Sequence, residues 1–304
     1  MGTTWHVSYH AGPKSPSQQA TQQAIESILL AVNESMSTYL PGSEISRFNR
    51  AAPEQWFSVS TQFVTVLTAA LEVGRRSLGA YDVTVEPLVN RWGFGPAMRQ
   101  QDLPEEKEIA LLMDRVGQDK LAIDDVAQAI VKHGDIAVDF SSIAKGFAVD
   151  EVANWLVQQG IEHFLVEIGG EMRVAGLSGR GDAWRIAIET PEATGRSVAR
   201  AIQLHDVAVA TSGDYRNFFE HDGKRYSHSI DPRTGYPVEH DLVSVTVLHA
   251  SAMMADAWAT ALTVLGTEQA MAVAQQQGLA VYLIRREGDS FVDSYSDTFT
   301  PYIE

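Results

Sequence analysis

Apolar residues recur at helical spacing in two stretches of the first third of the chain. Ala24, Ile28 and Val32 follow one another at intervals of one helical turn, which predicts an amphipathic helix over residues 17–35. A similar pattern predicts a second helix over residues 61–77. Both helices would bury one face against the rest of the protein.

The segments between and after these helices have other patterns. Residues 1–9 have a strand-like composition, and residues 81–85 alternate between apolar and polar side chains, so both favour β-strands. Residues 91–96 contain glycine and proline and are typical of a loop. Residues 97–134 are polar and charged, and we expect them to form a peripheral helical excursion.

The second half of the chain has the clearest pattern. Strands outnumber helices there, hairpin signals mix with strand–helix–strand units, and no linker or repeat interrupts the sequence. The sequence therefore predicts an α+β fold, with one mixed-sheet domain over residues 1–304. The predicted helices cover residues 147–158, 251–265 and 267–277, and the predicted strands cover residues 136–140, 164–168, 242–249, 279–286 and 290–294.

Net charge limits the possible ligands. The 304 residues include 23 basic and 39 acidic side chains, which gives a formal net charge of −16. No basic cluster is present that could neutralise the phosphates of a nucleic acid, so nucleic-acid binding is not expected. A small molecule rich in phosphate would need local positive charge from a metal ion, a helix N-terminus or a lysine.

Cysteine is absent, which excludes disulfides, thiolate catalysis and cysteine-ligated zinc. No run of apolar residues approaches the roughly 18 that a membrane span needs. The chain also lacks the basic start and apolar stretch of a secretory leader. Two interpretations remain open: a cytoplasmic protein, or an exported one whose leader has been removed.

Two segments combine charge with helix geometry. In Asp139–Gly146, serines can cap a helix and Lys145 adds positive charge, as in a phosphate cradle; the alternative is an ordinary cap with a solvated lysine. In an apolar helix, Asp256 and Thr260 lie one turn apart and offer two hard oxygen ligands of the kind that Mg²⁺ accepts. The alternative for Asp256 is a capping or hydrogen-bonded carboxylate.

Four further segments contain candidate residues. His228 precedes the turn of residues 231–235 and is the best-placed general base, although a lone histidine is more often structural. Two glycines before Glu171 indicate either close backbone approach or a tight turn. Tyr39 in a loop could stack on a planar ring, and residues 79–82 could pass close to a ligand edge.

The order of these motifs resembles the ApbE-type FAD:protein FMN transferase family, from the first residue to beyond residue 265. Jointly the motifs are specific, although several are short. The segments that carry the resemblance are Met1–Thr3, Ser37–Asn49, Tyr81–Gly95, Asp139–Gly146, Glu167–Glu171, Thr211–Tyr215, His228–Gly235 and Asp256–Thr260.

The resemblance implies a set of binding residues. The positions that match the family's magnesium ligands are Ser142, through its carbonyl, Asp256 and Thr260. Ser142 and Lys145 vary among family members. The positions that match the family's FAD contacts are Met1, Tyr39, Ala80, Tyr81, Asp82, Asp139, Lys145, Glu171 and Ile230.

The resemblance also implies a reaction, partners and a location. A Thr or Ser hydroxyl of an acceptor protein would attack the flavin-side phosphorus of FAD, AMP would leave, and Mg²⁺ at Asp256 would supply positive charge. His228 is our candidate for taking the hydroxyl proton. Relatives are commonly exported and lipid-anchored, so we expect a periplasmic protein attached to the inner membrane, or a cytoplasmic one if no leader was removed.

Three alternatives compete with this expectation. An FAD diphosphatase would use water in place of the protein hydroxyl, and a non-catalytic flavin carrier would leave FAD unchanged. Short motifs at Ser142–Lys145, Tyr215–Asn217 and Arg233–Gly235 resemble those of penicillin-recognising acyl enzymes. The last of these motifs lies in a proline-flanked turn, where such enzymes need a strand, so we give this alternative little weight.

Overall fold

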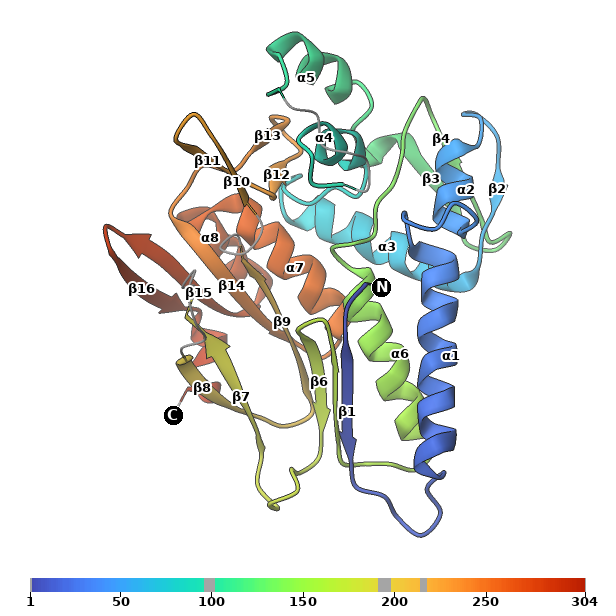
Figure 1. The fold of residues 1–304 in the computed structure, drawn as a ribbon, viewed down its shortest axis with the longest axis vertical. Coiled ribbons are helices and arrows are strands. Elements are labelled where there is room, and N and C mark those ends of the chain that lie inside the picture. The colour runs from blue at the N-terminus through green and yellow to red at the C-terminus, as the bar shows by residue number, and fades with distance from the viewer. Residues whose placement is uncertain (1, 96–101, 191–197, 214–217, 304) are drawn as a thin grey trace. The chain divides into compact units, whose positions relative to one another are not determined.

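The computed structural model describes residues 2–95, 102–190, 198–213 and 218–303 (Figure 1). Met1, Pro96 and the motif residues 214–217 lie outside these ranges. The chain divides into two compact units. Unit 1 comprises Met1–Ala31, Ile143–Arg216 and His240–Glu304, and unit 2 comprises Val32–Ser142 and Asn217–Glu239. A single domain over residues 1–304 stays a prediction.

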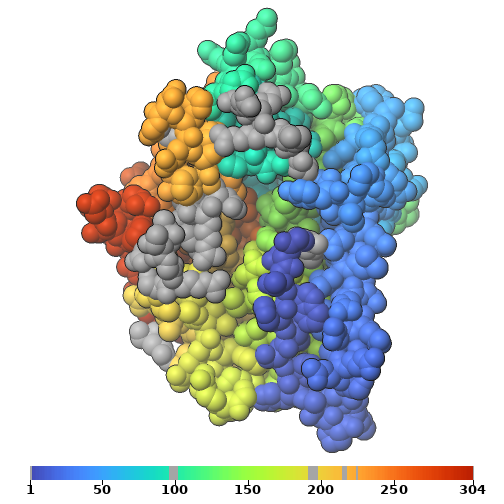
Figure 2. Space-filling view, viewed as in Figure 1, coloured from blue at the N-terminus to red at the C-terminus, as the bar shows by residue number. Residues whose placement is uncertain are grey.

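Unit 1 is built on a seven-stranded sheet with the strand order β1-β5-β6-β9-β14-β15-β16. Every strand pair in the described residues of this sheet is antiparallel. The strands are β1 (Trp5–Tyr9), β5 (Phe164–Ile168), β6 (Glu171–Ala175), β9 (Val207–Gly213), β14 (Leu242–His249), β15 (Ala280–Glu287) and β16 (Ser290–Tyr295). In Figure 2, β1 is exposed along its length, as expected of an edge strand.

Two helices of unit 1 pack against the sheet and against each other. Helix α6 (Ala144–Gln158) contacts β5 and β6, and helix α7 (Ala252–Leu265) contacts β9 and β14. Buried alanines line much of α7, so its backbone can approach its neighbours closely. The first turns of both helices therefore lie next to the sheet, where charged side chains from three elements can meet.

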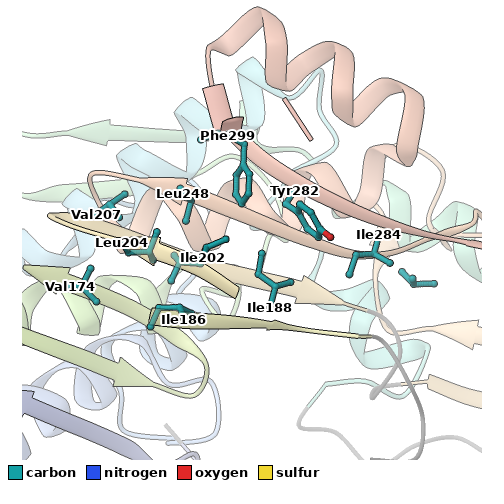
Figure 3. Close-up of a cluster of buried hydrophobic side chains, with 13 residues drawn as sticks. Val174, Ile186, Ile188, Ile202, Leu204, Val207, Leu248, Tyr282, Ile284 and Phe299 are labelled. Carbon is teal, nitrogen blue, oxygen red and sulfur yellow. The ribbon is translucent and has the colours of Figure 1, made fainter. Parts of the chain in front are cut away.

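A hydrophobic core of unit 1 lies between the sheet and the hairpin of β7 (Trp184–Glu189) and β8 (Val198–Leu204). Ile186 and Ile202 of the hairpin point toward Val207 and Leu248 of the sheet (Figure 3). Phe299 from the 3₁₀-helix η2 (Asp297–Tyr302) completes this core. The remaining helices of the unit are α8 (Thr267–Gln277) and the first part of α1 (Gln18–Met36).

Among its described residues, unit 2 has more helical than strand residues and contains three small sheets. One apolar cluster packs Leu88, Trp92 and Ile109 against Ile230. The elements of unit 2 are α2 (Glu44–Arg50), β2 (Phe57–Ser58), α3 (Thr61–Arg76), α4 (Glu86–Arg91), α5 (Glu106–Met113), η1 (Gln118–Lys120), β3 (Leu121–Asp124), β4 (Ala129–Lys132), β10 (Phe218–His221), β11 (Lys224–Ser227), β12 (Ile230–Asp231) and β13 (Tyr236–Pro237). None of the helices described in either unit combines the length and hydropathy that crossing a membrane requires.

The predicted α+β class is confirmed, and the long helices and most strands lie where the pattern predicts them. The predicted mixed sheet is antiparallel in the described residues. Helices α7 and α8 both lie between β14 and β15. A single connecting helix would return the chain parallel to β14, whereas the second helix reverses its direction again, so β15 runs antiparallel to β14. The helical excursion expected over residues 97–134 is helical only in part. Helix α5 lies within it, whereas residues 121–132 form the β3–β4 hairpin.

Two predicted strands, residues 81–85 and 136–140, are not strands. The Asp82 carboxylate accepts hydrogen bonds from the backbone and hydroxyl of Thr84, which closes a local turn. The side-chain amide of Asn49 bonds both the N–H and the C=O of Val138, taking the place of a neighbouring strand. The two segments still meet, because the Asp139 N–H donates to the Val83 carbonyl at 2.8 Å.

Candidate functional site

A buried charge cluster lies in unit 1, where α6, β6 and α7 meet. The ammonium Nζ of Lys145, in the first turn of α6, lies 3.2 Å from Oε1 of Glu171 at the start of β6. It also lies 3.4 Å from each carboxylate oxygen of Asp256 on α7. Glu171 and Asp256 are each only 5% exposed. We call these three residues the charge cluster.

The start of α7 is fixed by a second acidic side chain. Ser251 caps the helix, accepting a hydrogen bond from the Met254 N–H. Asp150 of α6 accepts hydrogen bonds from the Ser251 hydroxyl at 2.7 Å and from the Met253 N–H at 3.0 Å. The other oxygen of Asp150 accepts from Arg173 at 2.9 Å. These bonds tie α6 to α7 and set the position of the turn that carries Asp256.

Close backbone contact brings the two helices together at Gly146. Its N–H donates to Oδ2 of Asp256 at 3.0 Å. A Cβ atom on Gly146 would lie 2.2 Å from the carbonyl oxygen of Ala252, so a side chain cannot fit there. A hydrogen-bonded carboxylate was the alternative interpretation of Asp256, and the hydrogen bond is present.

The turn between β5 and β6 passes close to the lysine of the charge cluster. Gly169 has a φ of +64°, and a Cβ atom there would lie 3.0 Å from Cγ2 of Thr3 and 3.3 Å from Cδ of Lys145. Gly169 and Gly170 form the two-residue turn of the β5–β6 hairpin, so the alternative interpretation of a tight turn is confirmed. The lysine stem lies against this turn.

The pKa values of Lys145 and Glu171 are set by burial and by the pairing of two carboxylates with one ammonium. Burial and the neighbouring Asp256 carboxylate raise the pKa of Glu171, against the opposing effect of Lys145. Burial alone would lower the pKa of Lys145, but the Asp256 and Glu171 carboxylates outweigh it and raise that pKa. Oε2 of Glu171 is buried and has no hydrogen-bond partner among the described residues. Two acids thus share one cation.

The donor chemistry of the cluster fits a hard divalent cation. Asp256 supplies a carboxylate, and Thr260 supplies a hydroxyl one helical turn later. With both acids ionised the cluster has an excess negative charge. Within the described ranges, no three His, Asp or Glu side chains are grouped as metal ligands. A metal here would take one carboxylate and neutral oxygens, which suits Mg²⁺ because it keeps waters and binds substrate phosphates.

Unit 2 contains a second group of predicted site residues. Ala80 and Tyr81 are buried, and the Tyr81 hydroxyl accepts a hydrogen bond from the Ser142 hydroxyl at 2.9 Å. Asp82 accepts bonds from Thr84 and, at 3.0 Å, from the Gln118 N–H, so its carboxylate is occupied in holding the loop. Burial raises the pKa of Asp82 despite these hydrogen bonds.

The start of α6 differs from the expectation. Ile143 occupies the cap position without a side-chain hydrogen bond, so the expected serine caps are wrong. The Ser141 N–H instead donates to Asp139 at 2.7 Å, and the Ser142 hydroxyl is directed to Tyr81. Burial raises the pKa of Asp139 against the effect of the Ser141 hydrogen bonds. The alternative of a solvated Lys145 is also wrong, because its ammonium is bound by two buried acids.

The remaining predicted residues of unit 2 have different surroundings. His228 is half-buried between β11 and β12, and its ring meets that of Phe94 edge-on at 6.3 Å. Ile230 is buried in the apolar cluster of unit 2, and its backbone pairs with Pro237. Tyr39 is 70% exposed. The turn expected at residues 231–235 is present, closed by the Gly235 N–H to the Asp231 carbonyl.

The structure brings the predicted residues together in two groups. One is the charge cluster in unit 1, with Thr260 one turn from Asp256; the other, in unit 2, comprises Ala80–Asp82, Asp139 and Ser142. Nothing in the sequence indicates the separate role of Gly146, and Asp150 was not among the predicted site residues. Asp150 is an acidic residue among apolar residues of a helix, as Asp256 is. The same pattern would therefore have indicated Asp150 as a candidate.

Comparison with known proteins decides the family. The sequence profile described as "ApbE family" matches residues 1–283. The chain belongs to the ApbE family. A curated FAD:protein FMN transferase of Vibrio cholerae is 46% identical over 304 residues, covering 100% of this chain and 90% of the relative. The Escherichia coli K12 protein of the same name is 39% identical, covering 100% and 87%.

The fold agrees with that of solved family members. The flavin transferase ApbE from Vibrio cholerae has a TM-score of 0.93 and 45% identity, covering 100% of this chain and 96% of that chain. The apo flavinyl transferase ApbE of Pseudomonas stutzeri has a TM-score of 0.92 and 37% identity, with coverage of 100% and 94%. The resemblance inferred from the motifs is therefore confirmed over the whole chain.

Proposed function

We propose that this protein is an FAD:protein FMN transferase that moves FMN from FAD onto a Thr or Ser hydroxyl of an acceptor protein. Membership of the ApbE family supports this, as do relatives of that name at 39% and 46% identity. The observation that carries the proposal is the buried charge cluster of Lys145, Glu171 and Asp256. An acidic protein that binds a diphosphate needs such a site for cations.

The reaction balances with FAD and the acceptor protein as its two substrates, and it needs no oxidant or reductant. The acceptor oxygen forms a bond to the flavin-side phosphorus of FAD, and the bond from that phosphorus to the bridging oxygen breaks. AMP leaves with the electron pair of the broken bond. The acceptor's proton passes to a base, for which His228 is our candidate because its imidazole is half-buried rather than fully enclosed. Phosphoryl transfer of this kind depends mainly on positioning and charge neutralisation.

Magnesium is part of the proposal. Asp256, Thr260 and the carbonyl of Ser142 would hold the ion. When bound, Mg²⁺ would neutralise negative charge on the diphosphate. The protein's own contribution is the fixed position of Asp256, which Gly146 and the capped start of α7 support. Burial adds to this contribution, because a carboxylate that is 5% exposed interacts strongly with a cation.

The proposed FAD contacts are more widely spread. Lys145 and Glu171 belong to the charge cluster, and the exposure of Tyr39 leaves its ring available to a ligand. The remaining proposed contacts are Met1, Ala80, Tyr81, Asp82, Asp139 and Ile230. For Ile230 the backbone is the available group, because the side chain is buried in the apolar cluster of unit 2.

The location is also a proposal. We expect a periplasmic protein attached to the inner membrane through a lipid, on the basis of the family resemblance alone. Fractionation of cells that express the natural gene, followed by immunodetection, tests this. Detection in the soluble cytoplasmic fraction would contradict it.

One experiment tests the reaction. The purified protein is incubated with FAD, Mg²⁺ and membrane proteins from a strain of the source organism that lacks the gene, and the products are examined by in-gel flavin fluorescence and peptide mass spectrometry. We expect a Thr or Ser peptide carrying FMN, and AMP in equal amount. FMN and AMP free in solution, with no labelled peptide, would instead identify an FAD diphosphatase. Unchanged FAD would identify a flavin carrier.

A control reaction addresses the acyl-enzyme alternative. In the structure the Ser142 hydroxyl is bonded to Tyr81, and Lys145 is bound to two carboxylates. Arg233–Gly235 lies in a turn rather than a strand. These observations argue against a serine acyl enzyme, and we expect a fluorescent penicillin to leave the protein unlabelled.

A further inference from the structure

The ammonium of Lys145 occupies the place of a cation in the charge cluster. It lies 3.4 Å from both oxygens of Asp256, so it faces the carboxylate symmetrically rather than one oxygen alone. Its contact with Glu171 is shorter, at 3.2 Å. A divalent ion on Asp256 would therefore meet a positive charge already in position, and like charges at such short range repel strongly.

We infer that Lys145 is the built-in counter-ion of Asp256, and that a divalent cation binds Asp256 only when the ammonium moves from Asp256 onto Glu171. This inference rests on the proposed function for the identity of the metal. It assigns Glu171 a role that differs from metal binding. Glu171 keeps the displaced lysine, so neither buried charge is left uncompensated.

The geometry of Glu171 supports this exchange. Its Oε1 already holds the ammonium, and its Oε2 is buried without a hydrogen-bond partner among the described residues. A second acceptor on the same carboxylate is what an ammonium needs when it gives up the two oxygens of Asp256. The unpartnered oxygen, which is costly in a buried acid, then has a use in the metal-bound state.

Lys145 has the freedom to make this short movement. Its side chain is 29% exposed, and its flexible stem lies against the turn at Gly169. The exchange is a short movement of charge between two acids that both already contact the ammonium. Removing the lysine should strengthen metal binding, and removing its second acid should weaken it.

Binding of Mn²⁺ to the flavin-free protein tests the inference directly. The free ion is measured by electron paramagnetic resonance during titration, with Mn²⁺ as the probe for a hard divalent cation. We expect Lys145→Met to bind Mn²⁺ about tenfold more tightly than the parent, and Glu171→Gln to bind it roughly fivefold more weakly. Arg185→Met removes an exposed cation of the same unit that is paired with Asp182, and should change the affinity less than about twofold.

The double variant separates the exchange from a general effect of charge. If Glu171 acts by holding Lys145, Glu171→Gln should change Mn²⁺ affinity less than about twofold in the Lys145→Met background. A simple charge effect would weaken binding equally in both backgrounds, and that result would overturn the inference. Unchanged or weaker binding by Lys145→Met would also overturn it.

Two further outcomes are decisive. Should Lys145→Met fail to fold, Glu171→Gln retains both Lys145 and Asp256, and equal or tighter Mn²⁺ binding by that variant would refute the exchange. Asp256→Asn distinguishes this inference from the proposed function. If it abolishes Mn²⁺ binding while Lys145→Met has no effect, only the exchange fails. If Asp256→Asn binds Mn²⁺ like the parent, both the exchange and the proposed metal site fail.

Discussion

The backbone N–H of Gly146 donates a hydrogen bond to Oδ2 of Asp256 at 3.0 Å, and this bond joins the first turn of α6 to α7. The contact exists because residue 146 has no side chain: a Cβ atom would lie 2.2 Å from the carbonyl oxygen of Ala252 and 2.8 Å from the Met253 Cα. The neighbouring atoms are backbone and cannot rotate away. The position of Asp256 therefore depends on a glycine in the facing helix.

Gly146→Ala should separate the two helices and destabilise the protein by about 1–3 kcal/mol, the usual cost of overpacking. Denaturant unfolding measures the loss. Gly42→Ala is the matched control, because nothing lies within 4 Å of a Cβ atom at that glycine. Equal stability of the two variants would show that α6 and α7 can move apart without cost.

Asp139→Asn should change how stability depends on pH. Burial raises the folded-state pKa of Asp139 above its unfolded value of about 3.9, so the folded protein holds the proton more tightly. The stability that this tighter proton binding contributes is fully present below the pKa of Asp139 in the unfolded state. It is lost as pH rises through the pKa of Asp139 in the folded state. The amide cannot titrate, so the variant should gain stability relative to the parent between about pH 4 and neutral pH.

Urea unfolding of the parent and of Asp139→Asn at several pH values in that window checks this expectation. The exposed Asp289→Asn serves as a control. A stability difference between parent and Asp139→Asn that stays constant, or that favours the parent as pH rises, would contradict the expected direction.

His228→Ala should slow FMN transfer by roughly 10²–10⁴-fold while leaving FAD affinity nearly unchanged, because a general base acts mainly in the transition state. Single-turnover rates and FAD titration measure the two quantities. His133→Ala removes an exposed histidine of the same unit and should have the parent rate. An undiminished rate in His228→Ala would assign the proton transfer to another group.

The parts of the fold that were predictable from sequence are those that local periodicity determines. Strand β14 and helix α8 have the predicted boundaries, because long apolar patterns leave little choice of element. The hairpin of residues 121–132 was missed. Lys132 is buried at 1% exposure and donates to the carbonyls of Asn49 and Ile136, and no sequence pattern indicates that a lysine lies in the core.

The sequence indicated which residues form the candidate site, but not which of them contact one another. Asp256 was singled out as a carboxylate in an apolar helix, and the structure shows that it is buried. Its contact with Lys145 could not be foreseen, because the two residues are 111 positions apart and meet only when α6 packs on α7. The cap at Ser141 or Ser142 failed for a similar reason: Tyr81 is distant in sequence and takes the Ser142 hydrogen bond.

We propose that Asp256 provides the carboxylate for a metal-dependent transfer of FMN. The most direct measurement is the rate of FMN transfer at increasing Mg²⁺ concentration for the parent, Asp256→Asn and Thr260→Ala, with circular dichroism to verify folding. We predict no transfer by Asp256→Asn at any Mg²⁺ concentration, because the site loses its carboxylate. Thr260→Ala should retain activity and need more Mg²⁺, because water can replace a neutral ligand. Transfer by Asp256→Asn at the parent rate, with unchanged dependence on Mg²⁺, would contradict the account.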